Sequence, residues 1–207
     1  MQFLDFIRLV TIGDVGMVSR ELTLAPLLAR TASDVGASRS NESQFFFAEI
    51  AHYLYAGDTA LHMAAAAFRR DVIELLIAHG ADCGAKNRRG AEPLHYAVDT
   101  NRWKPEAQVE AIMYLLMAGA DPNATDMDGV TPLHRAVRTR SAPAVQALLE
   151  GGANPTRRNK RGSTAMQLAR LTTGRGGSGT ERARQQQAEI IRMLIAHGAE
   201  AAGRADR

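Results

Sequence analysis

Apolar and polar positions recur along most of this chain in a two-part pattern. A short Leu- and Ala-rich stretch begins just after Gly57, Gly90, Gly129 and Gly162, and the four stretches align without gaps. The steps between these glycines are 33, 39 and 33 residues. Each stretch is followed by a second apolar block that ends in Gly-Ala and a polar residue. A period of this length is typical of repeat architectures, so the pattern predicts four copies of one structural unit.

Each unit is predicted to hold two helices and a turn. Thr59, Thr131 and Thr164 stand just before the first apolar stretch and are candidate N-caps. The second helix must stop where glycine can enter the left-handed region at little cost, which places its end at Gly80, Gly119, Gly152 and Gly198. That second helix is too apolar for a helix with one covered face. Each unit is therefore expected to bury its apolar residues against its neighbours.

The strings GVTPLHRAV and LLMAGADPNATDMDG resemble ankyrin repeats. The resemblance covers about residues 57 to 200. It implies an all-α fold, an ankyrin-repeat solenoid of antiparallel helix pairs with projecting β-hairpin or turn fingers and a concave binding face. The organisation expected from the sequence is a degenerate N-terminal ankyrin-like cap at 1–33, a polar loop and apolar capping helix at 34–56, four ankyrin repeats at 57–200 (57–89, 90–128, 129–161 and 162–200), and an exposed C-terminal tail at 201–207.

The chain ahead of the clear repeats keeps only part of the pattern. Gly13 and Val18 match the glycine between the helices and a valine of the second helix, so this segment is expected to be a degenerate capping repeat. The string FFFAEIAHYLY, residues 45–55, is predicted to form an apolar helix that leads into Gly57. Its three phenylalanines are expected to seal the end of the stack. An exposed aromatic patch there would instead mark a partner site.

Two insertions separate the helices of a unit, with 6 extra residues in the second repeat and 13 in the fourth. The first carries Trp103, the only tryptophan, which is either an exposed binding anchor or part of a lid packed on the helices. The second, TTGRGGSGTERARQQ, has the glycine spacing of a phosphate-binding loop but no lysine before Thr180. We interpret it as a flexible basic connection. The alternative is a loop that orders on a partner or an anion, with candidate anion-binding residues Arg170, Arg175, Arg182 and Arg184.

The histidines and the cysteine favour structural roles. His62, His95 and His134 share one position of the repeat, but equivalent positions in packed units lie roughly 10 Å apart, too far to share one metal ion. We expect buried imidazoles that bond the start of each first helix. Cys83 is interpreted as a packing residue, with a reactive thiol as the alternative. The chain also lacks a catalytic constellation, so we expect no enzyme activity, no metal and no cofactor.

Composition places the chain among ordinary globular proteins, because 45% of its 207 residues are apolar and 23% are charged. A single cysteine and the lack of a signal-like or membrane-spanning apolar run favour a cytoplasmic protein. The net charge is only +3, yet residues 151–207 hold 11 basic and 4 acidic side chains. An anionic partner at that end is therefore a hypothesis.

The resemblance implies that finger tips and the exposed ends of first helices face a partner. We expect another protein as that partner, bound by a monomer. The alternative is electrostatic binding of nucleic acid or another anionic ligand by the basic C-terminal repeats, which the acidic residues of the middle finger and the low aromatic content of 5% disfavour. The candidate partner-binding residues are Lys86, Arg88, Arg89, Asp99, Thr100, Trp103, Thr125, Met127, Asp128, Val130, Arg138, Thr139, Arg158, Lys160, Arg161 and Ser163.

Overall fold

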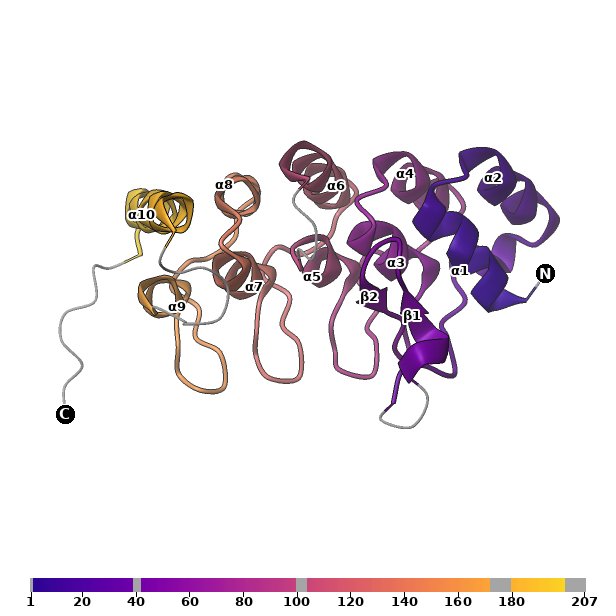
Figure 1. The fold of residues 1–207 in the computed structure, drawn as a ribbon, viewed down its shortest axis with the longest axis horizontal. Coiled ribbons are helices and arrows are strands. Elements are labelled where there is room, and N and C mark those ends of the chain that lie inside the picture. Colours follow the sequence, from indigo (N-terminus) through magenta and orange to yellow (C-terminus); the bar gives the residue numbers. More distant parts are fainter. Residues whose placement is uncertain (1, 39–41, 100–103, 172–179, 200–207) are drawn as a thin grey trace. The chain divides into compact units, whose positions relative to one another are not determined.

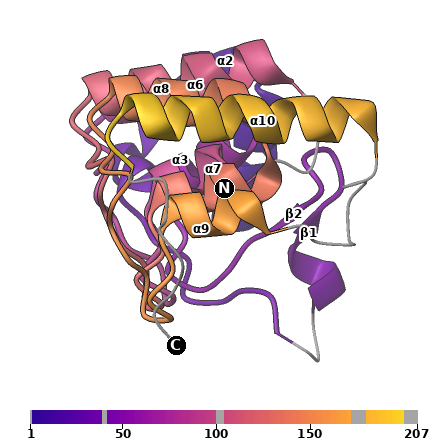
Figure 2. The ribbon, with the colours of Figure 1, turned by 90° about the vertical axis from the view of Figure 1, so that its left-hand side faces the viewer.

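The computed structural model describes residues 2–38, 42–99, 104–171 and 180–199. The chain divides into two compact units, residues 1–121 and residues 122–207, which we describe separately. Within each unit the helices form two layers (Figures 1 and 2). Helices of the same layer contact one another, as α3 and α5 do in unit 1 and α7 and α9 do in unit 2. The fold is therefore the expected all-α repeat solenoid of helix pairs.

Unit 1 begins with the helix pair α1 (Phe3–Ile12) and α2 (Val15–Leu24). Gly13 joins the two helices with a φ of 85°, a left-handed conformation that favours glycine. Asp14 caps α2, because its carboxylate accepts a hydrogen bond of 3.0 Å from the amide of Met17. A short 3-10 helix, η1 (Pro26–Ala29), follows. The N-terminal segment thus has the helix pair that its partial repeat pattern predicts.

The next segment corrects a sequence-based prediction, because the apolar helix expected over residues 45–55 is absent. A 3-10 turn, η2 (Glu42–Phe45), is followed by two short antiparallel strands, β1 (Phe46–Phe47) and β2 (His52–Tyr53). Phe45 and Phe47 are buried, but Phe46 between them is 41% exposed. This alternation is the period of a strand, and aromatic residues favour strands. Two of the three phenylalanines are therefore in the core, Phe47 on β1 and Phe45 at the end of the preceding 3-10 turn.

The repeats of unit 1 contain the helix pairs α3 (Ala60–Ala66) with α4 (Arg70–Ala78), and α5 (Pro93–Ala97) with α6 (Pro105–Met117). Thr59 caps α3 as predicted, and Glu92 has the equivalent role at α5. Every residue of α3 and of α5 is buried. Pro105, two residues after Trp103 of the first insertion, is the first residue of α6, where a proline costs no hydrogen bond.

Unit 2 contains the pairs α7 (Pro132–Thr139) with α8 (Ala142–Glu150), and α9 (Ala165–Arg170) with α10 (Glu181–Ala196). The side chains of Thr131 and Thr164 accept hydrogen bonds from backbone amides in the first turns of α7 and α9, as predicted. The end of the second insertion differs from the prediction. Residues 181–186 form the first turns of α10 rather than a loop, because Thr180 caps the helix by accepting a hydrogen bond from the amide of Ala183.

The repeat histidines are buried and join successive repeats. Nδ1 of His134 accepts a hydrogen bond from the amide of Thr131, so Nε2 carries the proton and donates to the carbonyl of Ser163 over 3.0 Å. His62 makes the equivalent bonds to Thr59 and Ala91. Burial lowers the pKa of both imidazoles, so both are neutral at physiological pH. These histidines are structural, as the sequence predicted.

Candidate protein-interaction surface

Three turns project from the helix pairs, and each is built in the same way. We call them finger 1 (residues 82–90), finger 2 (122–129) and finger 3 (154–162). Near each tip, one side-chain oxygen accepts hydrogen bonds of 2.9–3.0 Å from the amides two and four residues further on. The accepting residues are Asn87, Asp126 and Asn159. Such Asx turns fix the backbone, so the finger tips are ordered loops with defined directions.

Fingers 2 and 3 are joined to each other within unit 2. The amide of Lys160 in finger 3 donates a 2.9 Å hydrogen bond to the carbonyl of Asp128 in finger 2. Near the bases of these fingers, Asn123 accepts from the amide of Asn154 over 2.7 Å and donates to the carbonyl of Gly152 over 3.0 Å. The two fingers therefore form one hydrogen-bonded surface rather than two independent loops.

The acidic charge of finger 2 is partly used inside the protein. The Asp126 carboxylate forms an ion pair of 3.0 Å with Arg135 of α7, and both side chains are largely buried. Burial acts to raise the pKa of Asp126, but the amides of Val130 and Asp128 and the Arg135 guanidinium outweigh it and lower the pKa. Asp128 at the tip is exposed. Beside it Met127 is 63% exposed, so the tip presents one carboxylate and one apolar side chain.

The tip of finger 3 is strongly basic. Four cations, Arg157, Arg158, Lys160 and Arg161, fall within five consecutive residues, and all four are exposed. The Arg158 guanidinium donates to the carbonyl of Gly162 over 2.7 Å, which fixes its direction. Among the residues that the structure describes, no carboxylate forms an ion pair with any of these four side chains. Their charge is available to a partner.

The ends of the inner helices of unit 2 add further exposed positions. Arg138 at the end of α7 is exposed, whereas Thr139 is half-buried and donates to the carbonyl of Ala136 over 3.1 Å. The sequence did not single out the next residue, Arg140, which takes the left-handed conformation with a φ of 57°. Its Nη2 atom is buried and has no hydrogen-bond partner among the described residues. The other predicted positions here, Thr125, Val130 and Ser163, are half-buried.

In unit 1 the predicted partner-binding cations are engaged with the chain itself. Lys86 forms an ion pair of 3.7 Å with the buried carboxylate of Glu92. The guanidinium groups of Arg88 and Arg89 lie over the ring of Tyr55, 5.7 and 5.2 Å from its centre. Arg88 also donates to the carbonyl of Ala37 over 3.1 Å. Finger 1 is thus packed against the segment that precedes the first clear repeat.

That segment, residues 34–56, runs from finger 1 past α3 and α5, the first helices of the two clear repeats in unit 1. Its His52 ring lies 4.8 Å from the ring of Tyr96 on α5. At its far end the hydroxyl of Thr11 on α1 donates to the carboxylate of Glu49 over 2.6 Å. Figures 1 and 2 show the β1–β2 hairpin beside α3. The segment thus contacts finger 1 and α5, which the family resemblance placed on the partner-binding side of unit 1. Asp99, a predicted partner-binding residue, follows α5 and is half-buried.

A polar network anchors this covering segment at its C-terminal end. The carboxylate of Asp58 is buried and accepts hydrogen bonds from the amide of Tyr55, the amide side chain of Asn87 and the hydroxyl of Tyr96, at 2.6–2.9 Å. Because a buried carboxylate is costly unless it is fully hydrogen-bonded, the network fixes the segment, finger 1 and α5 together. Sequence periodicity carried no sign of this network.

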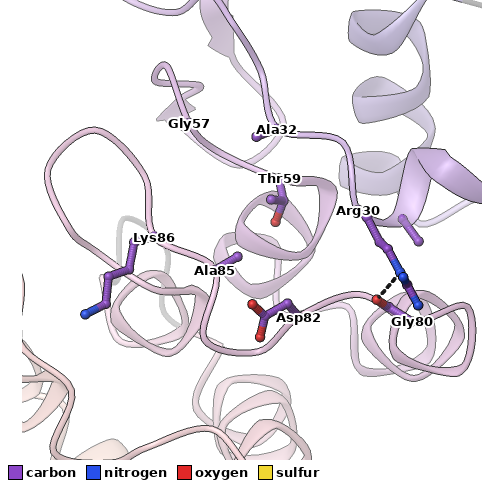
Figure 3. A pocket seen from close by; sticks show the side chains of 9 residues that line it. Arg30, Ala32, Gly57, Thr59, Gly80, Asp82, Ala85 and Lys86 are labelled. Atoms are coloured by element: carbon purple, nitrogen blue, oxygen red, sulfur yellow. Dashed lines mark hydrogen bonds between the residues drawn. The ribbon is translucent and has the colours of Figure 1, made fainter.

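A separate groove of about 370 Å³ lies at the base of finger 1. Figure 3 shows Arg30, Asp82 and Lys86 around it, together with Thr59 at the start of α3. Nε of Arg30 donates to the carbonyl of Gly80 over 2.9 Å. Charges of both signs line the groove, and the sequence did not single out Arg30.

Several predicted site residues lie elsewhere. Thr100, Trp103 and Arg175 lie outside the described residues. Arg170 is exposed at the end of α9, and Arg182 is exposed on the first turn of α10. Arg184 forms an exposed ion pair of 3.2 Å with Glu181. Anion binding by the four candidate arginines stays a prediction.

The described residues contain no candidate metal-binding cluster and no reactive thiol. No group of three or more His, Cys, Asp or Glu side chains within the described ranges could hold a metal ion. Cys83 is buried, and burial, together with the charge of Asp82, raises the pKa of its thiol, so little thiolate is present at neutral pH. Among all the residues that the structure describes, no helix has the length and apolar character needed to span a bilayer.

Comparison with protein families agrees with this geometry. A family model described as ankyrin repeats in three copies matches residues 41–126. A second model, described as ankyrin repeats in many copies, matches residues 115–169. The two matches overlap and together span residues 41–169, more than half of the 207-residue chain. With the repeated helix pairs, the capped first helices and the ordered fingers, these matches show that the chain belongs to the ankyrin-repeat family.

Proposed function

We propose that this protein is a non-catalytic interaction module that binds a partner protein through unit 2. Ankyrin repeats are generally protein–protein interaction modules, and proteins built from them are typically not enzymes. The proposed contact surface consists of the tips of fingers 2 and 3 and the exposed end of α7. It contains the candidate residues Met127, Asp128, Arg138, Arg158, Lys160 and Arg161.

The observation that carries this proposal is the contrast between finger 1 and finger 3. In finger 1, Arg88 and Arg89 lie against Tyr55 of the same chain. In finger 3, Lys160 and Arg161 stand on an equally ordered turn. Like Arg88 and Arg89 they are exposed and form no ion pair within the described chain, but no cation–π contact engages them there. Charged groups held in place without an internal partner favour fast and selective association with a complementary surface. The partner therefore contacts unit 2.

Affinity capture from native lysate tests the proposal. The wild-type protein is compared with a variant that carries Arg157→Glu, Lys160→Glu and Arg161→Glu and keeps Arg158, whose guanidinium bonds the turn. A matched control changes three exposed arginines away from the fingers, Arg8→Glu, Arg20→Glu and Arg192→Glu, and so has the same net charge. Thermal unfolding of all three proteins checks that each is folded. We expect a discrete protein that the wild type and the control retain and that the finger variant loses.

Nuclease treatment and two salt concentrations separate the alternative. A partner protein should survive nuclease. Recovery of nucleic acid with a steep loss of binding as salt rises would instead support the electrostatic alternative. Capture of the same protein by wild type and finger variant would move the contact surface away from finger 3. Recovery of neither a protein nor a nucleic acid would leave unit 2 without a binding role and would reject the proposal.

A further inference from the structure

We infer that finger 3 recognises a short acidic peptide segment of its partner, and that this segment carries an apolar residue which contacts Met127. This inference rests on the proposed function and names the chemistry of the partner. It uses four features of unit 2: the density of cations, the rigidity of the turn that carries them, the exposed methionine beside them, and the absence of aromatic residues from this part of the sequence.

The density of positive charge is the first feature. Two cations stand on each side of a single neutral residue, Asn159, and all four are exposed: Arg157, Arg158, Lys160 and Arg161. Like charges this close repel one another, and the repulsion is relieved when carboxylates bind between them. Arginine also offers paired donors that match a carboxylate, with charge-assisted hydrogen bonds that are stronger than neutral ones. The finger is therefore suited to bind several carboxylates at once.

The turn holds these cations in place before a partner arrives. An antiparallel bridge between Arg158 and Thr164 closes its base, and Asn159 accepts from the amides of Arg161 and Ser163 at its tip. The bond from Lys160 to the carbonyl of Asp128 fixes the finger against finger 2. A fixed backbone reduces the conformational entropy lost on binding, which leaves more of the ionic attraction as affinity.

The shape of the turn favours a flexible peptide as the ligand. The side chains of successive residues in a tight turn diverge, so a flat array of anions cannot reach all of them. Carboxylates along a flexible chain can. Met127 lies next to Asp128, whose carbonyl is bonded to finger 3, and its side chain is 63% exposed. Methionine adapts to many apolar shapes. The peptide that fits thus combines acidic residues with one apolar residue.

The same surroundings disfavour nucleic acid. The exposed carboxylate of Asp128 borders the basic turn and would repel the backbone of a longer polyanion. Residues 122–207 contain no phenylalanine, tyrosine or tryptophan, so unit 2 lacks the large aromatic side chains on which bases stack best. A short acidic segment avoids both difficulties, since its carboxylates can stay at finger 3, its apolar residue rather than an anion lies near Met127 and Asp128, and it needs no stacking.

Fluorescence anisotropy with defined probes tests the inference. The probe is a short fluorescein-labelled peptide rich in glutamate, with one leucine, and its control has glutamine in place of every glutamate. The test variant carries Arg157→Gln, Lys160→Gln and Arg161→Gln, which remove three positive charges. It keeps Arg158, because the guanidinium of Arg158 donates to the carbonyl of Gly162 within the turn. The matched control protein carries Arg8→Gln, Arg20→Gln and Arg192→Gln. Each protein is measured at about 50 and 300 mM NaCl, where screening differs.

We expect the wild type and the matched control to bind the acidic peptide with Kd values within about twofold of each other. The finger variant should bind roughly 3- to 125-fold more weakly, as expected for the loss of three exposed ion pairs that each contribute between about 1.4-fold and about fivefold. Met127→Ser should raise the Kd for the leucine-containing peptide. The Kd for a peptide with serine in place of the leucine should be the same for Met127→Ser and the wild type. The glutamine peptide should not bind.

Three results would overturn the inference. They are no binding of the acidic peptide by the wild type, equal binding by the finger variant, and tighter binding of a single-stranded DNA of matched charge that the finger variant also loses. If the peptide fails to bind while a lysate protein is still captured through unit 2, the proposed function stands and the acidic segment is wrong. If capture from lysate fails as well, both are rejected.

Discussion

The amide of Lys160 donates a hydrogen bond of 2.9 Å to the carbonyl of Asp128, the residue that precedes the glycine of the third repeat. In unit 1, the amide of Arg88 makes the same bond, at 3.0 Å, to the carbonyl of Ala56, which precedes the glycine of the first repeat. Ala56 therefore takes the place that belongs to a finger in unit 2. The covering segment is thus equivalent to an additional, enlarged finger that precedes finger 1.

The bases of the fingers support this description. A single antiparallel bridge joins Ala32 to Thr59, as another joins Arg158 to Thr164 at finger 3. The bridge encloses five residues in finger 3 but 26 residues ahead of the first repeat. The extra length accommodates the β1–β2 hairpin. An enlarged finger of this kind gives the chain a covering segment for unit 1 without a break in the repeat pattern.

Removal of one ring should release that covering segment. Tyr55→Ala deletes the ring over which Arg88 and Arg89 lie, and cation–π contacts of this kind contribute about 0.5–2 kcal/mol. We expect faster hydrogen exchange at the amides of Ala37 and Leu54, which bond within the segment. Tyr114→Ala on α6, which removes a cation–π contact with Arg70 of α4, is the matched control. Equal exchange in the two variants would show that Tyr55 does not hold the segment.

Replacement of a repeat histidine should change the pH dependence of stability. His134→Gln can keep the bond to the Thr131 amide, as Gln167 does for Thr164 over 2.8 Å in the fourth repeat, but it loses the bond to the carbonyl of Ser163. At pH 7 and above, the free energy of unfolding should fall by about 1 kcal/mol.

The sign of the pH effect follows from the lowered pKa of His134 in the folded state. Below about pH 6.5 the unfolded chain binds more protons at this position, so the wild type loses stability as the pH falls. The glutamine variant lacks that loss. Urea titrations from pH 5 to 8 should therefore show a difference between the two proteins that narrows toward low pH. A difference that stays constant or widens would contradict a buried neutral imidazole.

Truncation in the core of unit 2 should be costly. Leu148 on α8 is fully buried, and α8 packs against both α7 and α10. Leu148→Ala should lower the free energy of unfolding by about 2–5 kcal/mol, because it removes buried apolar area and leaves a cavity. Leu171, which is 57% exposed, offers a control, and Leu171→Ala should cost less than about 0.5 kcal/mol. A cost below about 1 kcal/mol for Leu148→Ala in chemical denaturation would contradict this packing.

The thiol of Cys83 should react slowly in the folded protein. Burial and the neighbouring charge of Asp82 raise its pKa, and alkylating reagents attack the thiolate. We expect alkylation at pH 7.5 to be at least about tenfold slower in the native state than in denaturing urea. Similar rates in the two states would favour the alternative interpretation of Cys83 as a reactive thiol.

Local sequence signals were sufficient for the repeated elements. The period of the glycines, the cap residues Thr59, Thr131 and Thr164, and the paired apolar blocks predict the helix pairs that the structure contains. These signals work because a cap, a first-turn proline or a left-handed glycine acts within a few residues of its own helix. The buried positions of the repeat histidines follow from the same register.

The covering segment could not be predicted in this way. FFFAEIAHYLY is too short and too uniformly apolar to separate a helix from two strands, so its hairpin depends on contacts distant in sequence. The hydrogen bonds that Thr11 donates to Glu49, and that Asn87 and Tyr96 donate to Asp58, link residues 29–38 positions apart. No local pattern records such pairs.

The chemistry of the fingers divides along the same line. Repeat register alone placed charged residues at every finger tip, because the turn between two repeats must be polar and exposed. It could not separate Arg88 and Arg89, which lie over the ring of Tyr55, from Lys160 and Arg161, which lie over no ring within the described chain. That difference arises because the segment of residues 34–56 places Tyr55 beside finger 1, and such a long-range contact is a property of the assembled chain.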